Sequence, residues 1–334
     1  QNNGGDDLAL GADGAFTFST KVAYGDPYVV TVKTQPAAPS ETCTVSTGTG
    51  TMPANDINSV SVTCTVNTYT VGGTLTGLAS GGSVVLQVNG SSDLPLTAVG
   101  NFVFPPLADG TAYTVTVATQ PTGQTCTVNN GSGQLAGADI SDVTVSCVSE
   151  TYSLGGQLTG LEVGNTLVLQ NNGGDDLILS TDGPFTFAGP VTFGARYTVA
   201  IKTQPSAPNQ FCTVSNGSGT MPANDVDTVY VTCTVLKYTV GVSVSGLASG
   251  QNVSLLNNGK DPITASADGG PFAFPTQLPD GSSYNVTVGF QPDGQTCSVT
   301  NGSGVIAGAT VVDPLVTCVD NEYTVGGLLS GLEP

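Results

Sequence analysis

The sequence predicts an all-β protein built from tandem immunoglobulin-like β-sandwich domains of about 85 residues, each with one disulfide. Three observations carry this prediction. Near copies of one pattern recur with a period marked by the tyrosines Tyr69, Tyr152, Tyr238 and Tyr323, which are 83, 86 and 85 residues apart. The eight cysteines form four pairs, each with a separation of 21 residues. Within each period the chain alternates apolar and polar residues in short runs broken by turn residues, with no helical periodicity.

The second period shows the expected strands most clearly. It contains the runs "YTVGGTLTGL", "SVVLQVNG", "LPLTAV", "NFVFPPL", "AYTVTVATQP", "TCTVNNG" and "DVTVSC". About seven short strands in roughly 85 residues are typical of an immunoglobulin-like sandwich. In the run "YVVTVK" of the first period, alternation places Tyr28, Val30 and Val32 on the core face and Lys33 on the opposite face, and "YTVAIK" does the same for Lys202.

The period gives the expected domains. These are a first repeat without its N-terminal strands at residues 1–67, complete repeats at residues 68–150, 151–236 and 237–321, and the first strand of a fifth repeat at residues 322–334. Only four residues separate each second cysteine from the next repeat's tyrosine, and none of these connections contains Gly or Pro. We therefore expect a semi-rigid string of domains rather than flexibly linked ones.

The cysteines are expected to form disulfides within each repeat. The expected pairs are Cys43 with Cys64, Cys126 with Cys147, Cys212 with Cys233, and Cys297 with Cys318. Zinc ligands would need closely spaced cysteines or histidines, and the chain has no histidine. Strand alternation directs both thiols of a pair toward the core, from the two outer ends of one hairpin made of the last two strands. In the chain-entropy model such a bridge contributes about 3 kcal/mol, and it indicates an oxidising, extracellular environment.

Composition excludes several classes of function. With 6 basic against 25 acidic residues, the formal charge is −19, which disfavours binding to nucleic acid or to anionic membranes, and no apolar run is long enough to span a membrane. Without histidine a catalytic triad has no base, so the sequence predicts neither an enzyme nor a cofactor site. Carbohydrate-binding platforms usually present tryptophan, which the chain lacks, or exposed tyrosine.

Paired carboxylates are the only candidate metal ligands. Asp6 with Asp7, and Asp175 with Asp176, follow "NNGG" and offer oxygen ligands for calcium. We favour an acidic hairpin turn in which Asn and Gly supply positive φ angles, because the second and fourth repeats have "VNGSSDL" and "NNGKDPI" instead.

The sequence offers candidate residues for two kinds of covalent modification. The motif "NGS" at Asn130, Asn216 and Asn301 admits glycosylation, but the first repeat has Thr47 at this position, so turn chemistry is the favoured interpretation. Lys33 and Lys202 could form isopeptide crosslinks, but such lysines need to be buried, and alternation places both outward.

A longer period overlies the first. The first and third repeats share "QNNGGDDL", a "TQPxAP" turn and "TMPAND", whereas the second and fourth share "GQTC" and "AGA". The repeating unit is thus a pair of domains of about 170 residues, produced either by a recent duplication or by selection for regular contacts. The sequence begins and ends inside repeats, which favours a window of a longer array; the alternative is a subunit whose terminal strand completes its neighbour.

The repeats "YTVGGTLTGLASGGSVVLQVNGSSDLPL", "AYTVTVATQPTGQTCTVNNGSG" and "VTVSC" resemble the bacterial immunoglobulin-like repeats of very large secreted or surface-anchored proteins, including proposed adhesins. The resemblance covers the whole chain and implies export and a structural or adhesive role, with no shared catalytic or ligand residue. The expected function is an extracellular filament, fibre or cell-surface stalk whose partners are copies of itself. The alternative is an adhesin or carbohydrate-binding array that contacts cell-surface or matrix glycans.

Overall fold

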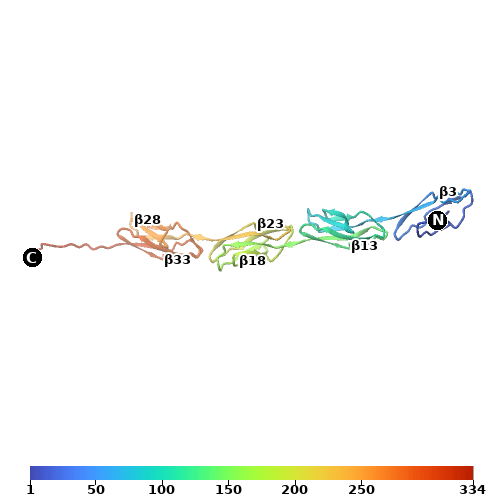
Figure 1. The fold of residues 1–334 in the computed structure, drawn as a ribbon. Coiled ribbons are helices and arrows are strands. Elements are labelled where there is room, and N and C mark those ends of the chain that lie inside the picture. The colour runs from blue at the N-terminus through green and yellow to red at the C-terminus, as the bar shows by residue number, and fades with distance from the viewer. Residues whose placement is uncertain (334) are drawn as a thin grey trace. The chain divides into compact units, whose positions relative to one another are not determined.

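A computed structural model describes residues 1–333, and every regular element in that range is a β-strand. The chain divides into two compact units, Gln1–Glu150 and Thr151–Pro334. The first unit contains two sandwiches, named sandwich 1 (strands within residues 27–66) and sandwich 2 (strands within 68–149) (Figure 1). The second contains sandwich 3 (strands within 151–235) and sandwich 4 (strands within 237–320). The predicted class, tandem immunoglobulin-like sandwiches with one disulfide each, is confirmed. Among the described residues, no helix is long and apolar enough to cross a membrane.

Sandwich 2 shows the complete fold. One sheet has the order β12-β14-β6-β9, the other has the order β13-β11-β7-β8, and β5 pairs with β10 beside them. Side chains such as Leu75, Leu86, Phe104 and Val145 fill the space between the sheets and are at most 2% exposed. The strands are β5 (Thr68–Tyr69), β6 (Val71–Thr76), β7 (Val84–Val88), β8 (Ser91–Leu96), β9 (Gly100–Val103), β10 (Leu107–Ala108), β11 (Ala112–Thr119), β12 (Gln124–Asn129), β13 (Ser132–Gln134) and β14 (Ile140–Ser149).

Sandwich 3 repeats this arrangement, with sheets ordered β19-β16-β24-β22 and β18-β17-β21-β23 and the small pair β15-β20. Its strands are β15 (Thr151–Tyr152), β16 (Leu154–Thr159), β17 (Leu167–Asn171), β18 (Asp175–Leu179), β19 (Gly183–Thr186), β20 (Val191–Thr192), β21 (Arg196–Thr203), β22 (Gln210–Ser215), β23 (Ser218–Thr220) and β24 (Val226–Val235). It has its own apolar core, as expected for an independently packed domain.

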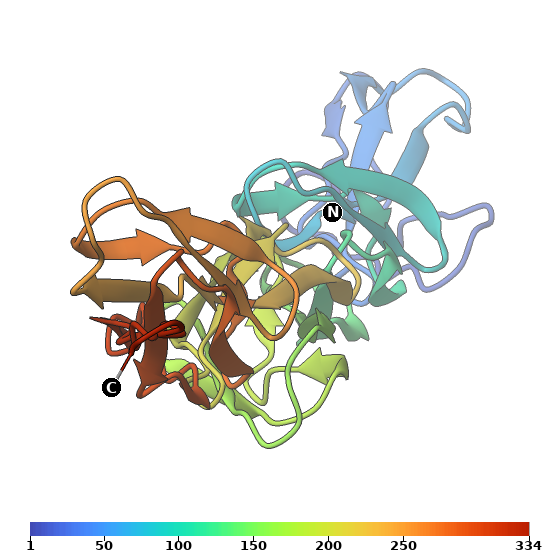
Figure 2. The same ribbon diagram turned by 90° about the vertical axis from the view of Figure 1, so that its left-hand side faces the viewer.

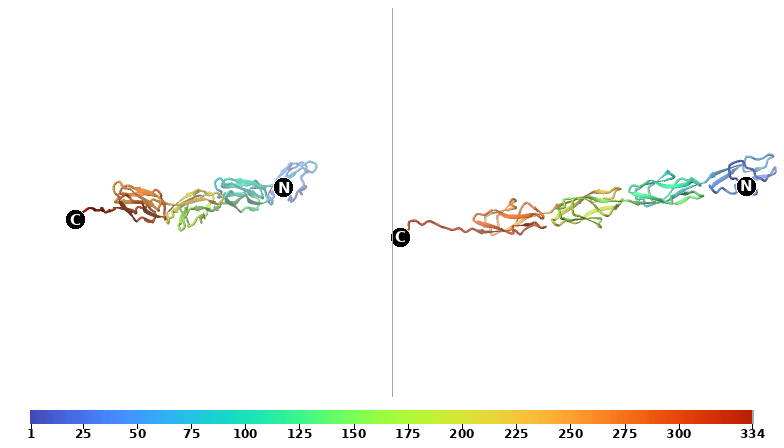
Figure 3. Two further views of the ribbon diagram at one scale, coloured as in Figure 1. Left: turned by 60° about the vertical axis from the view of Figure 1, so that its left-hand side comes forward. Right: turned by 60° about the horizontal axis from the view of Figure 1, so that its bottom comes forward.

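Sandwich 4 has sheets ordered β29-β26-β34-β32 and β28-β27-β31-β33, with the pair β25-β30. Its strands are β25 (Lys237–Tyr238), β26 (Gly241–Ser245), β27 (Val253–Asn257), β28 (Pro262–Ala265), β29 (Gly269–Ala273), β30 (Leu278–Pro279), β31 (Ser283–Phe290), β32 (Gln295–Thr300), β33 (Ser303–Val305) and β34 (Leu315–Asp320). Residues 321–332 form no strand and lead away from sandwich 4 in all views of Figures 1 and 3.

The glycines of the "VGG" motif allow the first long strand of a sandwich to pair closely with the last one. In sandwich 2, β6 runs parallel to β14, with Gly73 beside Val143 and Leu75 beside Val145. A Cβ atom on Gly73 would lie 1.7 Å from the carbonyl oxygen of Val143. A side chain at this position is therefore incompatible with the observed pairing.

The predicted cysteine hairpin is correct in its strands but wrong in its connection. Strands β12 and β14 are antiparallel neighbours, with Cys126 opposite Cys147. Between them, however, β13 crosses to the other sheet and pairs with β11. The crossing requires glycine, because a Cβ atom on Gly133 would lie 2.8 Å from the hydroxyl oxygen of Tyr113. The recurring Gly-x-Gly turn is explained by this passage over a buried tyrosine.

Sandwich 1 is sparser, and Figure 2 shows long segments without strand arrows in its blue and violet ribbon. Strand β1 pairs with β3, and β2 pairs with β4. Among the strands that the structure describes, β4 has no parallel neighbour corresponding to the pairing of β6 with β14. The strands are β1 (Pro27–Val29), β2 (Glu41–Ser46), β3 (Thr49–Thr51) and β4 (Ser61–Val66).

Candidate functional site: the joints within each pair

The connection between sandwiches 1 and 2 is held by one aspartate. Asp109 follows β10 and is 7% exposed. Its carboxylate accepts a hydrogen bond of 2.6 Å from the backbone N–H of Ser40 in sandwich 1, and one of 2.8 Å from the N–H of Gly137 in its own sandwich. Because both donors are backbone groups and the acceptor is charged, these are strong, directional contacts. The carboxylate thereby bonds both sandwiches at once.

The backbone reinforces this joint. A single residue, Asn67, separates β4 from β5. Its N–H donates to the carbonyl of Ser40 at 2.9 Å, and its own carbonyl accepts from the N–H of Asp109 at 2.8 Å. The hydroxyls of Ser40 and Tyr69 are also 3.0 Å apart. Both backbone groups of the linking residue are therefore engaged, one with each sandwich.

The second unit contains the same joint. Asp280, which is 9% exposed, accepts hydrogen bonds of 2.6 Å from the N–H groups of Asn209 and Gly308. Leu236 is the single residue between β24 and β25, and its N–H donates to the carbonyl of Asn209 at 2.9 Å. The carbonyl of Leu236 accepts from the N–H of Asp280 at 2.8 Å. The two joints thus use the same bonds at equivalent positions.

A proline loop packs on each joint. The peptides Ala38–Pro39 and Ala207–Pro208 are cis, and each proline faces a glycine that follows the clamping aspartate. Added Cβ atoms on Gly110 and Gly281 would lie 3.8 and 3.7 Å from the Cβ atoms of these prolines. The second joint borders an open groove of about 420 Å³, whose one carboxylate, Asp280, is already hydrogen-bonded.

Hydrogen bonding also affects the acidity of the first clamp. The N–H groups of Ser40 and Gly137, with a smaller contribution from Gly110, lower the pKa of Asp109 from its usual 3.8, because they stabilise the ionised form. The aspartate is therefore charged, and able to accept both bonds, throughout the neutral range.

The sequence contained a signal for these joints that the prediction did not use. The "TQPxAP" loop occurs in the first and third repeats, and Asp-Gly at the position of Asp109 occurs in the second and fourth. In the first and third repeats the aspartate position is held by Tyr24 and Phe193. Such complementary alternation in neighbouring repeats is what two sides of one contact produce.

The calcium candidates are engaged with protein groups. Asp6 accepts hydrogen bonds from the backbone N–H of Thr20 and the hydroxyl of Ser19. Asp7 forms an ion pair with Lys33. Asp175 accepts from the N–H of Gly189 at 3.1 Å, and Asp176 pairs with Lys202. The two carboxylates of each pair thus bond to different protein groups rather than facing one shared site. Asn3 and Asn172, in the two turns, have the positive φ angles expected of a tight hairpin.

The lysines lie outward, as strand alternation predicts. The side chains of Lys33 and Lys202 are 56% and 47% exposed and form ion pairs with Asp7 and Asp176. The hydrogen bonds that the two carboxylates accept, foremost those from the lysines, stabilise the ionised form and lower the pKa values of Asp7 and Asp176 below their usual 3.8. Pairs this exposed contribute little to stability.

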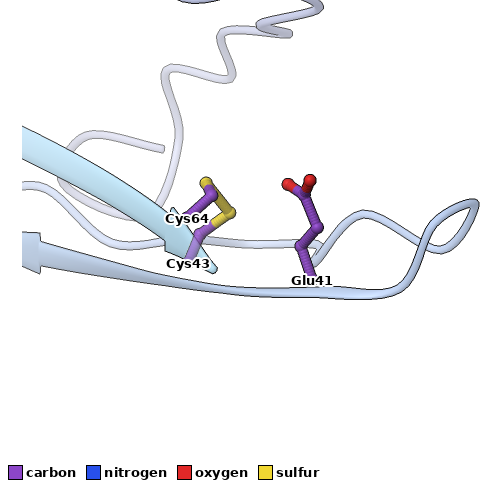
Figure 4. Close-up of side chains that lie close together, drawn as sticks. All are labelled: Glu41, Cys43 and Cys64. Carbon is purple, nitrogen blue, oxygen red and sulfur yellow. A yellow bond between two sulfur atoms is a disulfide. The ribbon is translucent and has the colours of Figure 1, made fainter. Parts of the chain in front are cut away.

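The disulfides join directly opposed strand residues. The bonds are Cys43–Cys64, Cys126–Cys147, Cys212–Cys233 and Cys297–Cys318. In the region that the structure describes, one group of side chains lies close enough together to hold a metal ion, namely Glu41, Cys43 and Cys64 (Figure 4). Both sulfur atoms are bonded to each other there, so that neither is a thiolate available to a metal ion.

No protein-family model and no curated protein sequence matches this chain. Among solved structures, it is similar to the Bacillus anthracis TIE protein, with 10% identity and a TM-score of 0.41 over 78% of this chain, and it spans 54% of that protein's structure. It is also similar to two B repeat units of the collagen-binding protein of Staphylococcus aureus (17% identity, TM-score 0.24, 80% of this chain and 79% of that one). A third is BcpA, the major pilin subunit of Bacillus cereus (10% identity, TM-score 0.26, 76% and 96%). Scores this low do not assign a function.

Proposed function

We propose that this chain is a structural part of an extracellular filament, fibre or cell-surface stalk, assembled from copies of itself or from a longer array of the same sandwiches. The observation that carries the proposal is the joint within each pair. Asn67 and Leu236 are one-residue linkers whose N–H and C=O groups bond to opposite sides of the joint. Rotation at such a linker must break backbone hydrogen bonds, so the joint resists bending.

The disulfides support an extracellular setting. Each bridge ties adjacent strands of one sheet across a separation of 21 residues, and such bonds persist in oxidising compartments. A domain of about 85 residues has a small core, for which a crosslink is a large part of the total stability. Domains that are each crosslinked by a disulfide and joined by one-residue linkers suit a structural role that bears mechanical load.

The proposal is tested by measuring motion within a pair. Backbone ¹⁵N relaxation on the full chain is expected to give sandwiches 3 and 4 a common rotational behaviour. Asp280→Ala is expected to separate them, while Asp268→Ala, which removes a carboxylate bonded to Leu247 within sandwich 4, is expected to leave it unchanged. Independent tumbling of sandwiches 3 and 4 in the unmodified chain would contradict a structural role based on stiff joints.

An adhesive role remains the second candidate because several aromatic side chains are exposed. The recurring Tyr113, Tyr197 and Tyr284 are buried, as alternation predicts, but Tyr24 and Phe290 are 79% and 78% exposed. Exposed rings can stack on sugars. Binding to a glycan array that is lost when Tyr24 and Phe290 are replaced by Ser would favour this role, and absence of binding would reject it for the glycans presented.

A further inference from the structure

The disulfide-bearing sheet of each complete sandwich ends in an edge strand. In sandwiches 2, 3 and 4 the strands β12, β22 and β32 stand at the end of their sheets, each beside one neighbour, β14, β24 or β34. The main-chain N–H and C=O groups on the outer side of such a strand can pair with another chain, which makes sheet edges common sites of unwanted association. The bonding of these groups therefore decides what the edge can bind.

The edge strands themselves carry none of the side chains that usually protect an edge. They read "QTCTVN", "QFCTVS" and "QTCSVT", without a charged residue and without proline. Each also alternates polar and apolar residues, as a strand that pairs readily does. Protection of these edges has to come from residues outside the strand.

The disulfide identifies the main-chain groups that point outward. The Cα atoms of Cys126 and Cys147 are 3.9 Å apart, a short separation that is typical of opposed residues that do not exchange hydrogen bonds. The N–H and C=O groups of Cys126 therefore point away from β14, and those of Gln124, two residues earlier, point the same way. The other disulfides have the same Cα separation, so that the same groups point outward in each sandwich.

A glutamine side chain occupies the outward groups of the cysteine. In sandwich 3 the amide nitrogen of Gln204 donates to the carbonyl of Cys212 at 3.0 Å, and the N–H of Cys212 donates to the amide oxygen of Gln204 at 2.8 Å. A carboxamide offers both a donor and an acceptor, as a peptide group does. The side chain of Gln204 therefore bonds the edge as a residue of a neighbouring strand would.

The proline after this glutamine bonds the next outward group. The carbonyl of Pro205 accepts from the N–H of Gln210, two residues before the cysteine, at 3.2 Å. Pro205 is buried and, as a proline, has no N–H of its own. The Gln-Pro dipeptide thus takes up three outward groups of β22, and its proline offers no donor to a further strand.

The same bonds recur in every sandwich, although the loops that carry them differ in length. The two bonds between glutamine and cysteine are 2.7 to 3.0 Å long in all four. The glutamine precedes its cysteine by 8 residues in sandwiches 1 and 3 and by 6 residues in sandwiches 2 and 4. The arrangement is therefore tied to the edge rather than to the path of the loop. The dipeptides are Gln35-Pro36, Gln120-Pro121, Gln204-Pro205 and Gln291-Pro292.

We propose that the Gln-Pro dipeptide closes the edge of each disulfide-bearing sheet to strands of a second copy of this chain. Without it, the outward groups of β12, β22 and β32 would pair with the same groups of another molecule, because these strands carry no charge or proline that would prevent it. The dipeptide thereby prevents neighbouring chains from joining sheet to sheet along their sides. This inference goes beyond the proposed function, since it applies whether or not the chain forms a filament.

The test compares two leucine substitutions within sandwich 3 of the full chain. Gln204→Leu removes both bonds to Cys212. Gln170→Leu is the matched control, because it makes the same change at another half-buried glutamine, whose amide donates to the Asp176 carboxylate instead of to a sheet edge. In light scattering over a range of concentrations, we expect Gln204→Leu to associate more than the unmodified chain, and Gln170→Leu to match it.

Hydrogen exchange tests the closure directly. In the unmodified chain the Cys212 amide is expected to be protected although it faces away from β24, and in monomeric Gln204→Leu it is expected to exchange roughly 10-fold faster. In the associated form of Gln204→Leu the same amide is expected to be protected again, because a strand of the second copy replaces the glutamine.

Association of Gln204→Leu equal to that of the unmodified chain would overturn the inference, and so would equal association of the two variants, which would indicate a general effect of added apolar surface. Rapid exchange of the Cys212 amide in the unmodified chain would overturn it even if Gln204→Leu failed to fold. These outcomes are distinct from the test of the proposed function, which depends on the relaxation of sandwiches 3 and 4 in the unmodified chain.

Discussion

Removing the carboxylate of Asp280 is the sharpest perturbation of the joint in the second unit. This side chain accepts two backbone hydrogen bonds of 2.6 Å, from Asn209 on one side and Gly308 on the other. A hydrogen bond to a charged group contributes about 1.5–3 kcal/mol net. The groove beside the joint lets water replace part of the lost acceptor, so we take the lower bound for each bond. Gly308 lies in the same sandwich as Asp280, so only the bond from Asn209 crosses the joint. Asp280→Ala is then expected to weaken the joint by about 1.5 kcal/mol.

This free energy can be read from hydrogen exchange at individual amides. About 1.5 kcal/mol corresponds to a factor of roughly 10 in the opening equilibrium. In Asp280→Ala the amides of Asn209 and Gly308 each lose one such bond and are therefore expected to exchange roughly 10-fold faster, while core amides of sandwiches 3 and 4 keep their rates. Asp268→Ala removes one 2.6 Å bond from Leu247 and is expected to affect that amide alone. Unchanged exchange at both Asn209 and Gly308 would refute the assignment of Asp280 as a clamp.

Three further outcomes are expected. Replacing both cysteines of one sandwich by serine is expected to cost about 3 kcal/mol and to lower its calorimetric melting temperature by roughly 10–20 °C, and a change within error would show that the bridge is not a stabilising staple. The folded pKa of Asp109 lies below 3.8, so its contribution to stability is fully present above pH 3.8 and is lost as the pH falls through the folded pKa. The NMR chemical shift of the Ser40 amide is therefore expected to titrate with a midpoint below pH 3.8. A midpoint at or above 3.8 would contradict the clamp. Gly156→Ala is expected to destabilise sandwich 3 by at least about 1–3 kcal/mol in chemical denaturation, because its Cβ would lie 1.8 Å from the carbonyl oxygen of Val229. The control Gly174→Ala, which has open space around it, is expected to be neutral. Equal effects of the two substitutions would argue against the close pairing of β16 with β24.

The strands and the core faces were predictable because they follow from local alternation. Tyr197 and Val199 are buried and Lys202 is outward, as period-two alternation requires. Each disulfide joins residues on adjacent strands, which the constant separation of 21 already favoured. The disposition of β13 was not predictable in the same way, because the crossing depends on a contact of Gly133 with Tyr113 on a different strand, which alternation within either strand does not reveal.

The joints escaped sequence analysis because they depend on pairs of residues in different repeats. Ser40 and Asp109 are 69 residues apart, and neither is unusual in its own repeat. An Asp-Gly turn and an Ala-Pro loop each have an ordinary local interpretation. Only their alternation between odd and even repeats distinguishes them, and its cause becomes visible when the loop and the aspartate lie side by side.

Labelling with gold-tagged antibodies raised against the chain, applied to intact cells that produce it, tests the central claim most directly. A structural role in an extracellular filament, fibre or stalk predicts label distributed along structures that project from the cell surface, without permeabilisation. Label confined to the interior, reached only after the envelope is opened, would contradict the account.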